Sequence, residues 1–386
     1  MARLLVIGGG IAGTAAALAL HKAGQEVAVY EAHPDSAEDI GAFLTLASNG
    51  LRALAQLDAT PAVTAIGFPL TTMRLLDAEG GEVARAPLGE ADDPGLRYRC
   101  LRRGELNTAL QAEAARRGIG VVHGARLASV ESGSEGVTAH FTDGSTATGD
   151  LLLGADGLNS TVRRVTAPAA QPRYAGQRVF YGYTALGPAA GEDEAACITM
   201  IRGSAAAFGH TTSPDGETYW FARVTADVPL TADEIAHATP TQWRDLLVPL
   251  LRKDATPAAD IVAATTAPVL VTNATEMPCG TPWRSGRTLL IGDAAHAASP
   301  ATGQGASMAL EDAVILAKCL RDAPDTESAL THYEALRRPR VEHNTTVSGN
   351  ISRGVHTPPP RTPGNAPPAR PVEELTRQLE WTAALR

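Results

Sequence analysis

The chain has 386 residues, more than the roughly 250–300 at which one hydrophobic core stops growing, so we expect two domains, separate or interleaved. Hydrophobic residues make up 44% and charged residues 19%, which is typical of a globular protein, and the four scattered cysteines indicate neither a disulfide framework nor a zinc site. A net charge of −9 without a block of one sign disfavours nucleic acid and anionic membranes as partners. No stretch has 18 apolar residues and no cleavage site follows the apolar start, so we expect a cytoplasmic protein without membrane contact.

The first 31 residues predict a βαβ unit. The apolar run Arg3–Ile7 indicates a strand buried on both faces, and it ends in the glycine-rich stretch Gly8–Gly13. Alanine and leucine dominate the next segment, which predicts a helix over Thr14–Gln25. A second buried strand, Glu26–Glu31, ends in a carboxylate.

Further along the chain we expect helices over Ser48–Leu57, with its first residue as cap, and over Arg103–Arg117. Segment Val137–Gly154 reads as a hairpin, because Asp143-Gly144 is a strong two-residue turn signal between alternating stretches. A buried strand, Leu151–Gly154, then leads into Asp156.

The pattern changes to strands of alternating character between residues 174 and 271, with strands expected over 179–185, 196–202, 206–212 and 217–225. The buried-strand pattern returns at Thr288–Asp293, and a long helix follows over Gln304–Leu320. We therefore predict an α/β fold: a Rossmann-like domain from residues 1–173 and 272–350, with a mainly antiparallel sheet domain inserted at 174–271. A Pro-rich linker at 354–371 and a short C-terminal helix at 372–386 complete the chain.

The glycine motif has the context of a dinucleotide site. Gly8, Gly10 and Gly13 follow a buried strand and open a helix, and Glu31 ends the next strand. The glycines permit the close approach of a pyrophosphate, the helix N-terminus attracts its charge, and Glu31 is suited to accept both hydroxyls of an adenosine ribose. A carboxylate at this place favours FAD or NAD over NADP. The alternative is a glycine-rich packing turn without a ligand.

Two more motifs follow in order: Asp150 to Arg163, with Asp156-Gly157 and Ser160, and Gly292-Asp293 with His296 and the Pro300 to Gly305 stretch. Their order and spacing resemble the single-component FAD-dependent aromatic hydroxylases of the para-hydroxybenzoate hydroxylase type. In size and motifs the resemblance is closest to the tetracycline-inactivating monooxygenase branch, and it extends from residue 3 to residue 340.

The resemblance implies a set of cofactor contacts. Asp293 would accept from a ribityl hydroxyl, Arg103 would meet the pyrophosphate or ribityl region, and the helix from Gln304 would stabilise the anionic reduced flavin. In the family, Asp156 is linked to both FAD and the nicotinamide cofactor. The residues assigned to the cofactor are Gly8, Gly10, Ile11, Ala12, Gly13, Glu31, Arg103, Asp156, Gly292, Asp293, Pro300, Gly303, Gln304, Gly305 and Ala306.

Simpler interpretations stay open for several of these residues. Asp293 is also placed to cap a helix, Arg103 to form a surface ion pair, and Asp156 with Ser160 to cap the next helix. His296 lies inside the cofactor motif, which favours a packing or hydrogen-bonding role over that of a catalytic base. The ten histidines form no metal-binding motif, so no metal is assigned.

The chain carries one dinucleotide fingerprint, so we expect FAD to be held tightly and NADPH or NADH to bind only transiently. Two features depart from the family pattern. Ala32 and His33 follow Glu31 where a basic residue is common, and the loop Ile40–Leu46, which in the family passes near the isoalloxazine, contains no arginine, although Gly41 and Phe43 can still pack there.

The inserted sheet is expected to supply the substrate wall. Period-two alternation places Tyr181 and Tyr183 on one face, and Phe208 and His210 likewise share a face. The alternative for each is ordinary sheet surface or core, and because the chemistry centres on the flavin we assign no catalytic side chain. The candidate pocket residues are Tyr181, Tyr183, Arg202, His210, Trp220 and Arg223.

By resemblance, the function is that of an FAD monooxygenase that uses NAD(P)H and O2 to hydroxylate an electron-rich aromatic or polycyclic small molecule through a flavin C4a-hydroperoxide. One alternative on the same fold is epoxidation or Baeyer–Villiger insertion. Others are an O2-independent FAD reductase or dehydrogenase and a flavin-binding protein without turnover. The substrate, the choice between NADH and NADPH, and the oligomeric state stay open.

Overall fold

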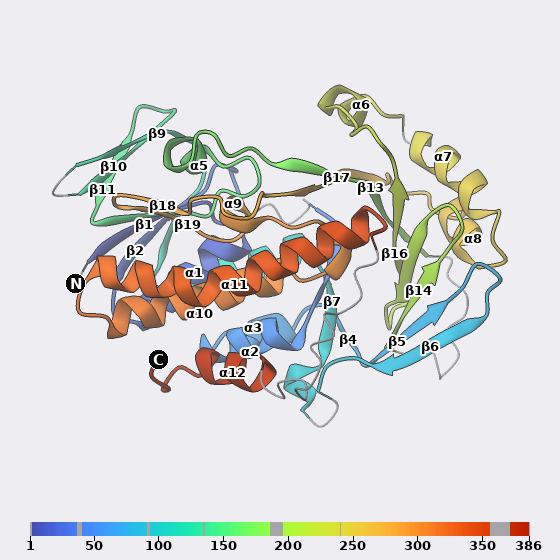
Figure 1. The fold of residues 1–386 in the computed structure, drawn as a ribbon, viewed down its shortest axis with the longest axis horizontal. Helices are drawn as coiled ribbons and strands as arrows, with labels where there is room; N and C mark the ends of the chain where they lie inside the picture. Colours follow the sequence, from blue (N-terminus) through green and yellow to red (C-terminus); the bar gives the residue numbers. More distant parts are fainter. Residues whose placement is uncertain are drawn as a thin grey trace.

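The computed structural model describes residues 2–36, 41–90, 93–133, 136–185, 196–239, 241–355 and 371–385. Over these ranges the chain has a mixed α/β architecture of four sheets and covering helices (Figure 1). One sheet has the order β18-β19-β12-β1-β2-β8, and it is parallel except at its edge strand β18. Its strands are β18 (Arg284–Ser285), β19 (Thr288–Leu290), β12 (Leu151–Gly154), β1 (Arg3–Ile7), β2 (Glu26–Tyr30) and β8 (Gly120–Val122).

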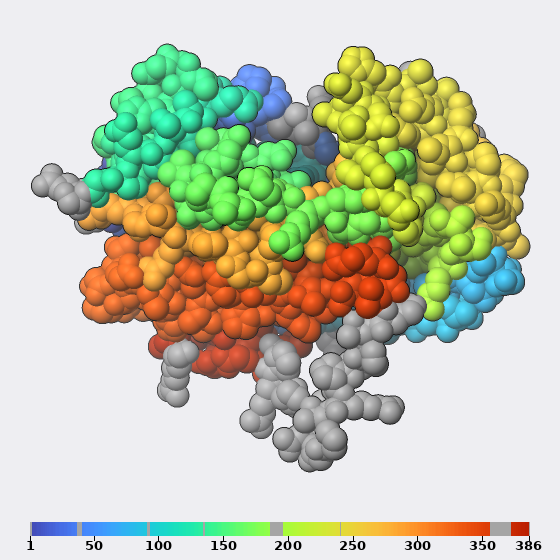
Figure 2. All heavy atoms as spheres, turned by 45° about the horizontal axis from the view of Figure 1, so that its top comes forward, coloured from blue at the N-terminus to red at the C-terminus, as the bar shows by residue number. Residues whose placement is uncertain are grey.

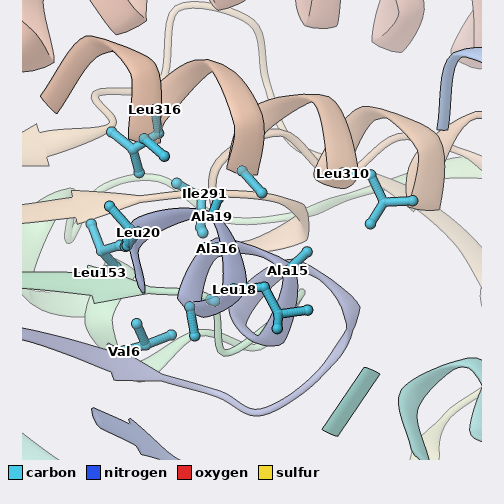
Figure 3. Close-up of a cluster of buried hydrophobic side chains, with 14 of the residues drawn as sticks. Val6, Ala15, Ala16, Leu18, Ala19, Leu20, Leu153, Ile291, Leu310 and Leu316 are labelled. Carbon is cyan, nitrogen blue, oxygen red and sulfur yellow. The ribbon is translucent and has the colours of Figure 1, made fainter. Parts of the chain in front are cut away.

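The predicted βαβ unit is present at the start of the chain. Strand β1 leads into helix α1 (Ile11–Lys22), which returns the chain to β2 beside β1. The helix begins three residues before the expected Thr14, because Gly10 has the extended conformation of an N-cap residue. Nearly all sides of α1 are buried, and its alanines let it pack closely between the sheet and helix α10 (Gly305–Asp322) (Figure 3).

The two strands of the predicted hairpin pair with each other and with a preceding strand in a three-stranded sheet, in which Gly144 makes the turn with φ of +85°. A second small sheet has the order β3-β7-β4. One expectation was wrong: Ala47 caps the helix predicted over Ser48–Leu57, and the Ser48 hydroxyl donates to the Leu96 carbonyl at 2.6 Å. The elements are β9 (Leu127–Ser132), β10 (Val137–Phe141), β11 (Thr146–Gly149), β3 (Phe43–Leu46), β7 (Tyr98–Arg102), β4 (Phe68–Leu70), α2 (Ser48–Gln56), α3 (Thr60–Thr64), α4 (Arg103–Arg116), α5 (Thr161–Thr166) and a 3-10 turn at Pro94–Leu96.

A seven-stranded sheet has the order β17-β13-β16-β15-β14-β5-β6. The four strands predicted between 179 and 225 are all in it, although β13 begins earlier than expected. Strands β5 and β6 come from the segment that the sequence assigned to the first domain, and β5 pairs in parallel with β14. The strands are β17 (Leu270–Glu276), β13 (Arg173–Thr184), β16 (Thr218–Thr225), β15 (Ala207–Thr212), β14 (Cys197–Arg202), β5 (Thr72–Leu76) and β6 (Glu82–Pro87).

The two faces of this sheet have different neighbours. One face is covered by α6 (Ala232–Ala236), α7 (Gln242–Leu251) and α8 (Ala258–Ala263) and forms a core of its own. The other face packs against the small sheet of β3, β7 and β4. Figure 2 shows the surface indented between the lobe that carries β9 to β11 and the lobe that carries α6 to α8.

The C-terminal half of the structure returns to the parallel sheet through α9 (Asp293–His296), a 3-10 turn at Pro300–Thr302, α10 and α11 (Thr326–Ser352). Within the predicted C-terminal helix range, α12 (Pro371–Leu379) buries Leu375 and Leu379 in the main core. Lys318 of α10 donates to the carbonyls of Gln378 and Glu380 at 2.5 and 2.6 Å. The predicted Pro-rich linker falls largely on residues 356–370, outside the described ranges.

None of the described helices combines the length and apolar character that a membrane crossing requires. Within the same residues, no three side chains of the metal-ligating types come together.

Candidate functional site

The glycine turn after β1 has the shape of a dinucleotide site. Gly8 has φ of +103°, and a Cβ there would lie 2.5 Å from the Ala155 carbonyl oxygen. A Cβ at Gly13 would lie 1.9 Å from the Gly8 oxygen, so both positions exclude any side chain. At Gly10, by contrast, a Cβ would meet nothing within 4 Å, and no side chain caps the start of α1. The start of α1 thus has no side-chain cap and has open space beside Gly10, which fits a phosphate group.

Glu31 lies just after β2 with its carboxylate fixed at the edge of this turn. One oxygen accepts from the Gly9 N–H at 2.5 Å and the other from the His33 N–H at 2.7 Å. Each carboxylate oxygen can accept more than one hydrogen bond, so the carboxylate is both oriented and still able to receive ribose hydroxyls. Contact with the ribose stays a prediction.

In the second motif, Asp156 and Ser160 make the contacts of helix-capping residues. Asp156 accepts from the N–H groups of Thr161 and Val162 at 2.7 and 3.1 Å and from the Ser160 hydroxyl. Ser160 in turn accepts from the N–H of Arg163 at 2.8 Å. These bonds satisfy the start of α5, and a cofactor contact by Asp156 stays a prediction.

The third motif lies directly against the first. Gly292 has φ of +57°, and a Cβ there would lie 2.7 Å from the Cβ of Ala12, so only glycine permits this approach. Asp293 opens α9 at the end of the sheet and is partly exposed. Among the described residues, none forms a hydrogen bond or ion pair with its carboxylate. Gln304 is the N-cap of α10 without a side-chain cap, and Gly305 and Ala306 form its first turn.

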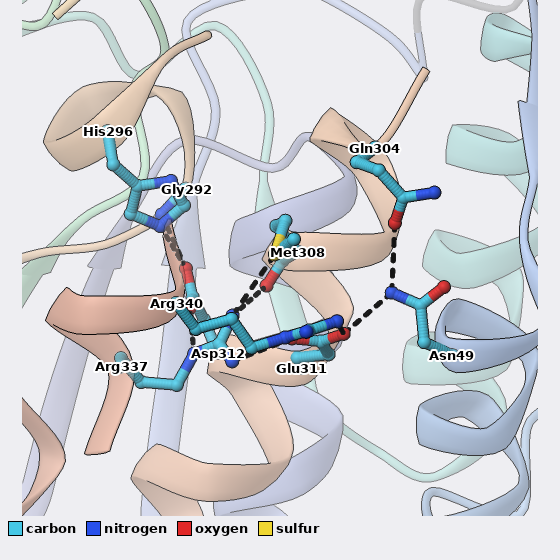
Figure 4. Close-up of polar contacts among 9 residues, drawn as sticks. All are labelled: Asn49, Gly292, His296, Gln304, Met308, Glu311, Asp312, Arg337 and Arg340. Atoms are coloured by element: carbon cyan, nitrogen blue, oxygen red, sulfur yellow. Dashed lines mark hydrogen bonds and ion pairs between the residues drawn. The ribbon is translucent and has the colours of Figure 1, made fainter. Parts of the chain in front are cut away.

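Buried charges hold this third motif in place (Figure 4). His296 contacts Asp312 through Nε2 at 2.6 Å, and the same carboxylate oxygen accepts from the Gly292 N–H at 3.1 Å. Arg337 of α11 donates to Asp312 at 2.8 Å and to Glu311 at 2.6 Å, and all three side chains are fully buried. Burial opposes ionisation of Asp312, but His296 and Arg337 together lower its pKa to about 2. His296 thus has the hydrogen-bonding role that its place in the motif favours.

The network continues to the start of α10. Burial opposes ionisation of Glu311, but Arg337 and Arg340 lower its pKa. Asn49 of α2 donates to Glu311 at 2.6 Å and to Gln304 at 3.1 Å (Figure 4). The two residues that begin and end this chain of contacts, Gln304 and His296, both belong to the predicted cofactor motif.

Arg103, a predicted cofactor residue, lies close to the seven-stranded sheet. It is the first residue of α4, and its exposed side chain runs beside Gly41, where a Cβ would lie 3.2 Å from its Cδ. Arg103 also lies close enough to Tyr181 to act on its phenol: burial raises the pKa of Tyr181 to about 12, while Arg223 and Arg103 oppose the rise.

Aromatic rings gather on the face of the seven-stranded sheet that is turned to β3. The ring of Phe43 lies 6.1 Å from Tyr181, 6.2 Å from Tyr183 and 5.5 Å from Tyr219. Phe221 lies 6.5 Å from Tyr181. We call this set of five the aromatic face. Tyr181 and Tyr183 share a face as predicted, whereas packing of Phe43 near the flavin ring stays a prediction.

Two pocket candidates belong to the opposite face, so their assignment was wrong. Trp220 is fully buried, and its indole N–H donates to Thr265 at 2.9 Å. His210 is buried opposite Trp220 in the strand register. Both lie on the side covered by α7 and α8, because they occupy even positions where the aromatic face takes odd ones. Arg202 is exposed at the end of β14, and its substrate contact stays a prediction.

Sequence reasoning missed the partners of the motif residues. Asn49, Glu311 and Asp312 were not singled out, yet two adjacent acids inside the apolar stretch Met308–Ala317 of α10 were a signal for buried ion pairs. Tyr219 and Phe221 were also missed, although they alternate with Trp220 along one strand. Period-two alternation along β16 would have placed Tyr219 and Phe221 on one face and Trp220 on the other.

The sequence matches the family described as FAD binding domain over residues 1–348. The aurachin C monooxygenase/isomerase of Stigmatella aurantiaca is 31% identical over 91% of this chain and 88% of its own. The FAD-dependent urate hydroxylase of Klebsiella pneumoniae is 33% identical over 88% and 86%. The kynurenine 3-monooxygenase of Salinispora arenicola is 32% identical over 88% and 77%.

Solved structures agree with this relationship. Klebsiella pneumoniae HpxO complexed with FAD and uric acid superposes with a TM-score of 0.80 at 28% identity, over 99% of this chain and 93% of the other. Tetracycline destructase Tet(51), at 20% identity and a TM-score of 0.66, shares the fold over 92% and 91%. The chain belongs to the FAD binding domain family and is an FAD-dependent monooxygenase of the aromatic hydroxylase type.

Proposed function

We propose that the three glycine-containing motifs hold FAD and that the aromatic face binds a small aromatic or polycyclic substrate, which is hydroxylated at the expense of NAD(P)H and O2. The observation that carries this proposal is the position of Arg103. Its side chain runs beside Gly41 and acts on Tyr181, so one of the predicted cofactor residues adjoins the aromatic face. The names of the relatives, which include a urate hydroxylase and a kynurenine 3-monooxygenase, support an aromatic substrate.

The residues fit FAD as the resident cofactor. The uncapped first turn of α1 and the open space at Gly10 suit the pyrophosphate, and the oriented carboxylate of Glu31 suits a ribose. Asp293, whose carboxylate has no partner among the described residues, suits a ribityl hydroxyl. The uncapped start of α10 suits the negative charge that the reduced flavin ring carries.

When bound, FAD accepts a hydride from NAD(P)H and activates O2 for transfer of one oxygen atom. The chain's own part is to position the substrate and to exclude water. The rings of the aromatic face, which pack edge to face, supply an apolar wall. Tyr181 stays protonated at neutral pH, because its pKa lies near 12, so it is a hydrogen-bond donor to the substrate and not a base.

The purified holoenzyme tests this function. It should be yellow, oxidise NADPH or NADH with uptake of O2, and release peroxide when no acceptor is present. A screen of aromatic compounds for faster flavin reduction, followed by mass spectrometry, should find a product with one added oxygen. NAD(P)H oxidation that proceeds equally well without O2 would contradict the proposal and favour a reductase.

The cofactor assignment is tested by Asp293→Ala. Loss of a hydrogen bond to a charged group should weaken FAD binding by about tenfold. Asp260→Ala, which removes an exposed carboxylate on α8, is the matched control and should leave FAD binding unchanged. Fluorescence titration of the stripped proteins with FAD measures both. Equal affinity in the two variants would remove Asp293 from the cofactor site.

A further inference from the structure

The side-chain amide of Asn49 lies between two oxygen atoms, one on the N-cap of α10 and one inside that helix. Its Nδ2 donates to Gln304 Oε1 at 3.1 Å and to Glu311 Oε1 at 2.6 Å (Figure 4). An amide NH2 group has two protons, so Asn49 uses both of them in these two bonds. Its contacts therefore join the start of α10 to an acid about two turns further along the same helix.

The charge of Glu311 determines how the two amides are oriented. Glu311 is fully buried, and its oxygens also accept from Arg337 and Arg340 at 2.6 to 2.8 Å. Burial opposes ionisation of Glu311, but the two arginines lower its pKa. An ionised carboxylate can only accept hydrogen bonds, so Asn49 must present its NH2 group to it. The second proton of that group then requires an acceptor, and Gln304 supplies its oxygen.

The NH2 group of Gln304 is consequently turned away from Asn49, as Figure 4 shows. Gln304 is half-buried, and its Nε2 donates to none of the residues that the structure describes. It belongs to the third motif, whose Gly292 lies against Ala12 of the glycine turn. The unused donor of Gln304 therefore lies in the predicted cofactor region, at the helix start that suits the negative charge of the reduced flavin.

Close packing of α2 on the first turn of α10 holds Asn49 in this place. A Cβ at Gly50 would lie 2.7 Å from Ser307 Oγ, so a side chain there would push the two helices apart. The N–H of Ala47, the N-cap of α2, donates to the same hydroxyl oxygen at 3.3 Å. The two helix starts thus meet closely, and Asn49 is the residue through which α2 reaches the Gln304 amide.

We propose that Asn49 is a positioning residue for the flavin: it holds the Gln304 amide so that the NH2 group donates to the end of the reduced ring that carries the negative charge. The inference deepens the proposed function, because it assumes that the third motif holds FAD. A donor aimed at a charge that develops on reduction stabilises the reduced cofactor more than the oxidised one. Without Asn49, the Gln304 amide would be free to rotate and to present its oxygen instead.

The midpoint potential of the bound FAD tests this role, measured at a pH where the reduced flavin is anionic. Gln304→Leu should weaken the binding of reduced FAD at least about tenfold relative to oxidised FAD, which lowers the potential of this two-electron couple by about 30 mV or more. Asn49→Leu should act in the same direction by at least about threefold, or about 15 mV, because the amide is kept but is no longer oriented. The double variant should match Gln304→Leu, since Asn49 acts only through Gln304.

A matched control and the double variant separate positioning from a structural role. Asn273→Leu removes a half-buried asparagine of β17 that makes two hydrogen bonds with the Leu230 backbone, and it should keep the wild-type potential. If Asn49→Leu fails to retain FAD, Asn49→Ser takes its place, because one hydroxyl proton can serve only one of the two oxygens. A merely structural Asn49 would shift the potential equally with and without Gln304, or would not shift it.

Three results would overturn the inference: a wild-type potential in Asn49→Leu, a wild-type potential in Gln304→Leu, or a double variant in which the two shifts add. None of them touches the proposed function if the wild type is yellow and consumes O2 with NAD(P)H. A wild type that binds no FAD, or that shows no O2-dependent turnover with any aromatic compound, would instead overturn the proposed function.

Discussion

Neighbouring residues of β16 serve opposite sides of the seven-stranded sheet, because successive side chains of a strand point to opposite faces. Tyr219 and Phe221 belong to the aromatic face, whereas Trp220 packs into the core under α7 and α8. Gly182 makes room for that indole, since a Cβ there would lie 2.3 Å from the Trp220 ring. At the scale of the residue, one step along the strand separates a side chain of the aromatic face, where we propose that the substrate binds, from a side chain of the packed core.

His210 lies on the packing side, and its burial has a measurable consequence. Burial, with the nearby charge of Arg74, lowers the pKa of His210 from 6.5 to about 4. The unfolded chain therefore binds a proton between pH 6.5 and 4 that the folded chain excludes, so stability is full above pH 6.5 and falls as the pH drops. Because of this one group, the free energy of unfolding should be about 2 kcal/mol lower at pH 5 than at pH 7.5.

Urea denaturation at pH 7.5 and pH 5 measures this loss. The His210→Leu variant should lose about 2 kcal/mol less than the wild type across that interval. His123→Leu, which changes an exposed histidine, is the matched control and should follow the wild type. The same loss in all three proteins would show that His210 does not set the acid sensitivity.

At the scale of the element, α10 and α11 are joined by charges as well as by apolar packing. Glu311 and Asp312 share Arg337, and through His296 and Asn49 they reach α9 and α2. Each acid also touches part of the predicted cofactor motif or its immediate partner. The network therefore fixes where the motif lies relative to the rest of the fold.

Arg337→Met should be strongly destabilising, because it leaves two buried carboxylates without their shared cation. We expect a loss of about 3–5 kcal/mol in the free energy of unfolding. Arg338→Met, on the same helix, removes a half-buried arginine that pairs with Glu334 and Glu342, and it should cost about 1 kcal/mol. Denaturation of the two variants measures both losses in the free energy of unfolding. Equal losses would mean that the buried ion pairs contribute no more to stability than the half-buried ones.

The elements with strong local signals could be predicted from the sequence. The βαβ unit, the hairpin turn at Gly144 and the long helix α10 all appear close to their expected bounds. Pairing between distant segments could not be predicted, because an alternating strand does not reveal which sheet it joins. For that reason β5 and β6 were left out of the seven-stranded sheet, and the contacts of Asn49 with Gln304 and Glu311 went unseen.

At the scale of the whole molecule, three segments far apart in the sequence meet at one glycine turn. Gly8 lies against Ala155 of the second motif, and Ala12 lies against Gly292 of the third. The family resemblance assigned residues of all three segments to the cofactor, and the distances explain why glycine is needed where the segments meet. The turn thus serves the packing of the molecule and, by the proposed function, the binding of FAD.

Substitutions at Gly10 and Gly13 distinguish the packing role of the turn from its proposed role in FAD binding. A Cβ at Gly13 would lie 1.9 Å from the Gly8 oxygen, so Gly13→Ala should lower the stability of the FAD-free protein by about 1–3 kcal/mol. A Cβ at Gly10 meets nothing within 4 Å, so Gly10→Ala should stay within about 1 kcal/mol of the wild type. The same methyl group would occupy the space proposed for the pyrophosphate, and FAD should bind at least about tenfold more weakly. Melting of the stripped proteins and FAD titration measure the two effects, and a Gly10→Ala variant with undiminished FAD affinity would place the phosphates elsewhere.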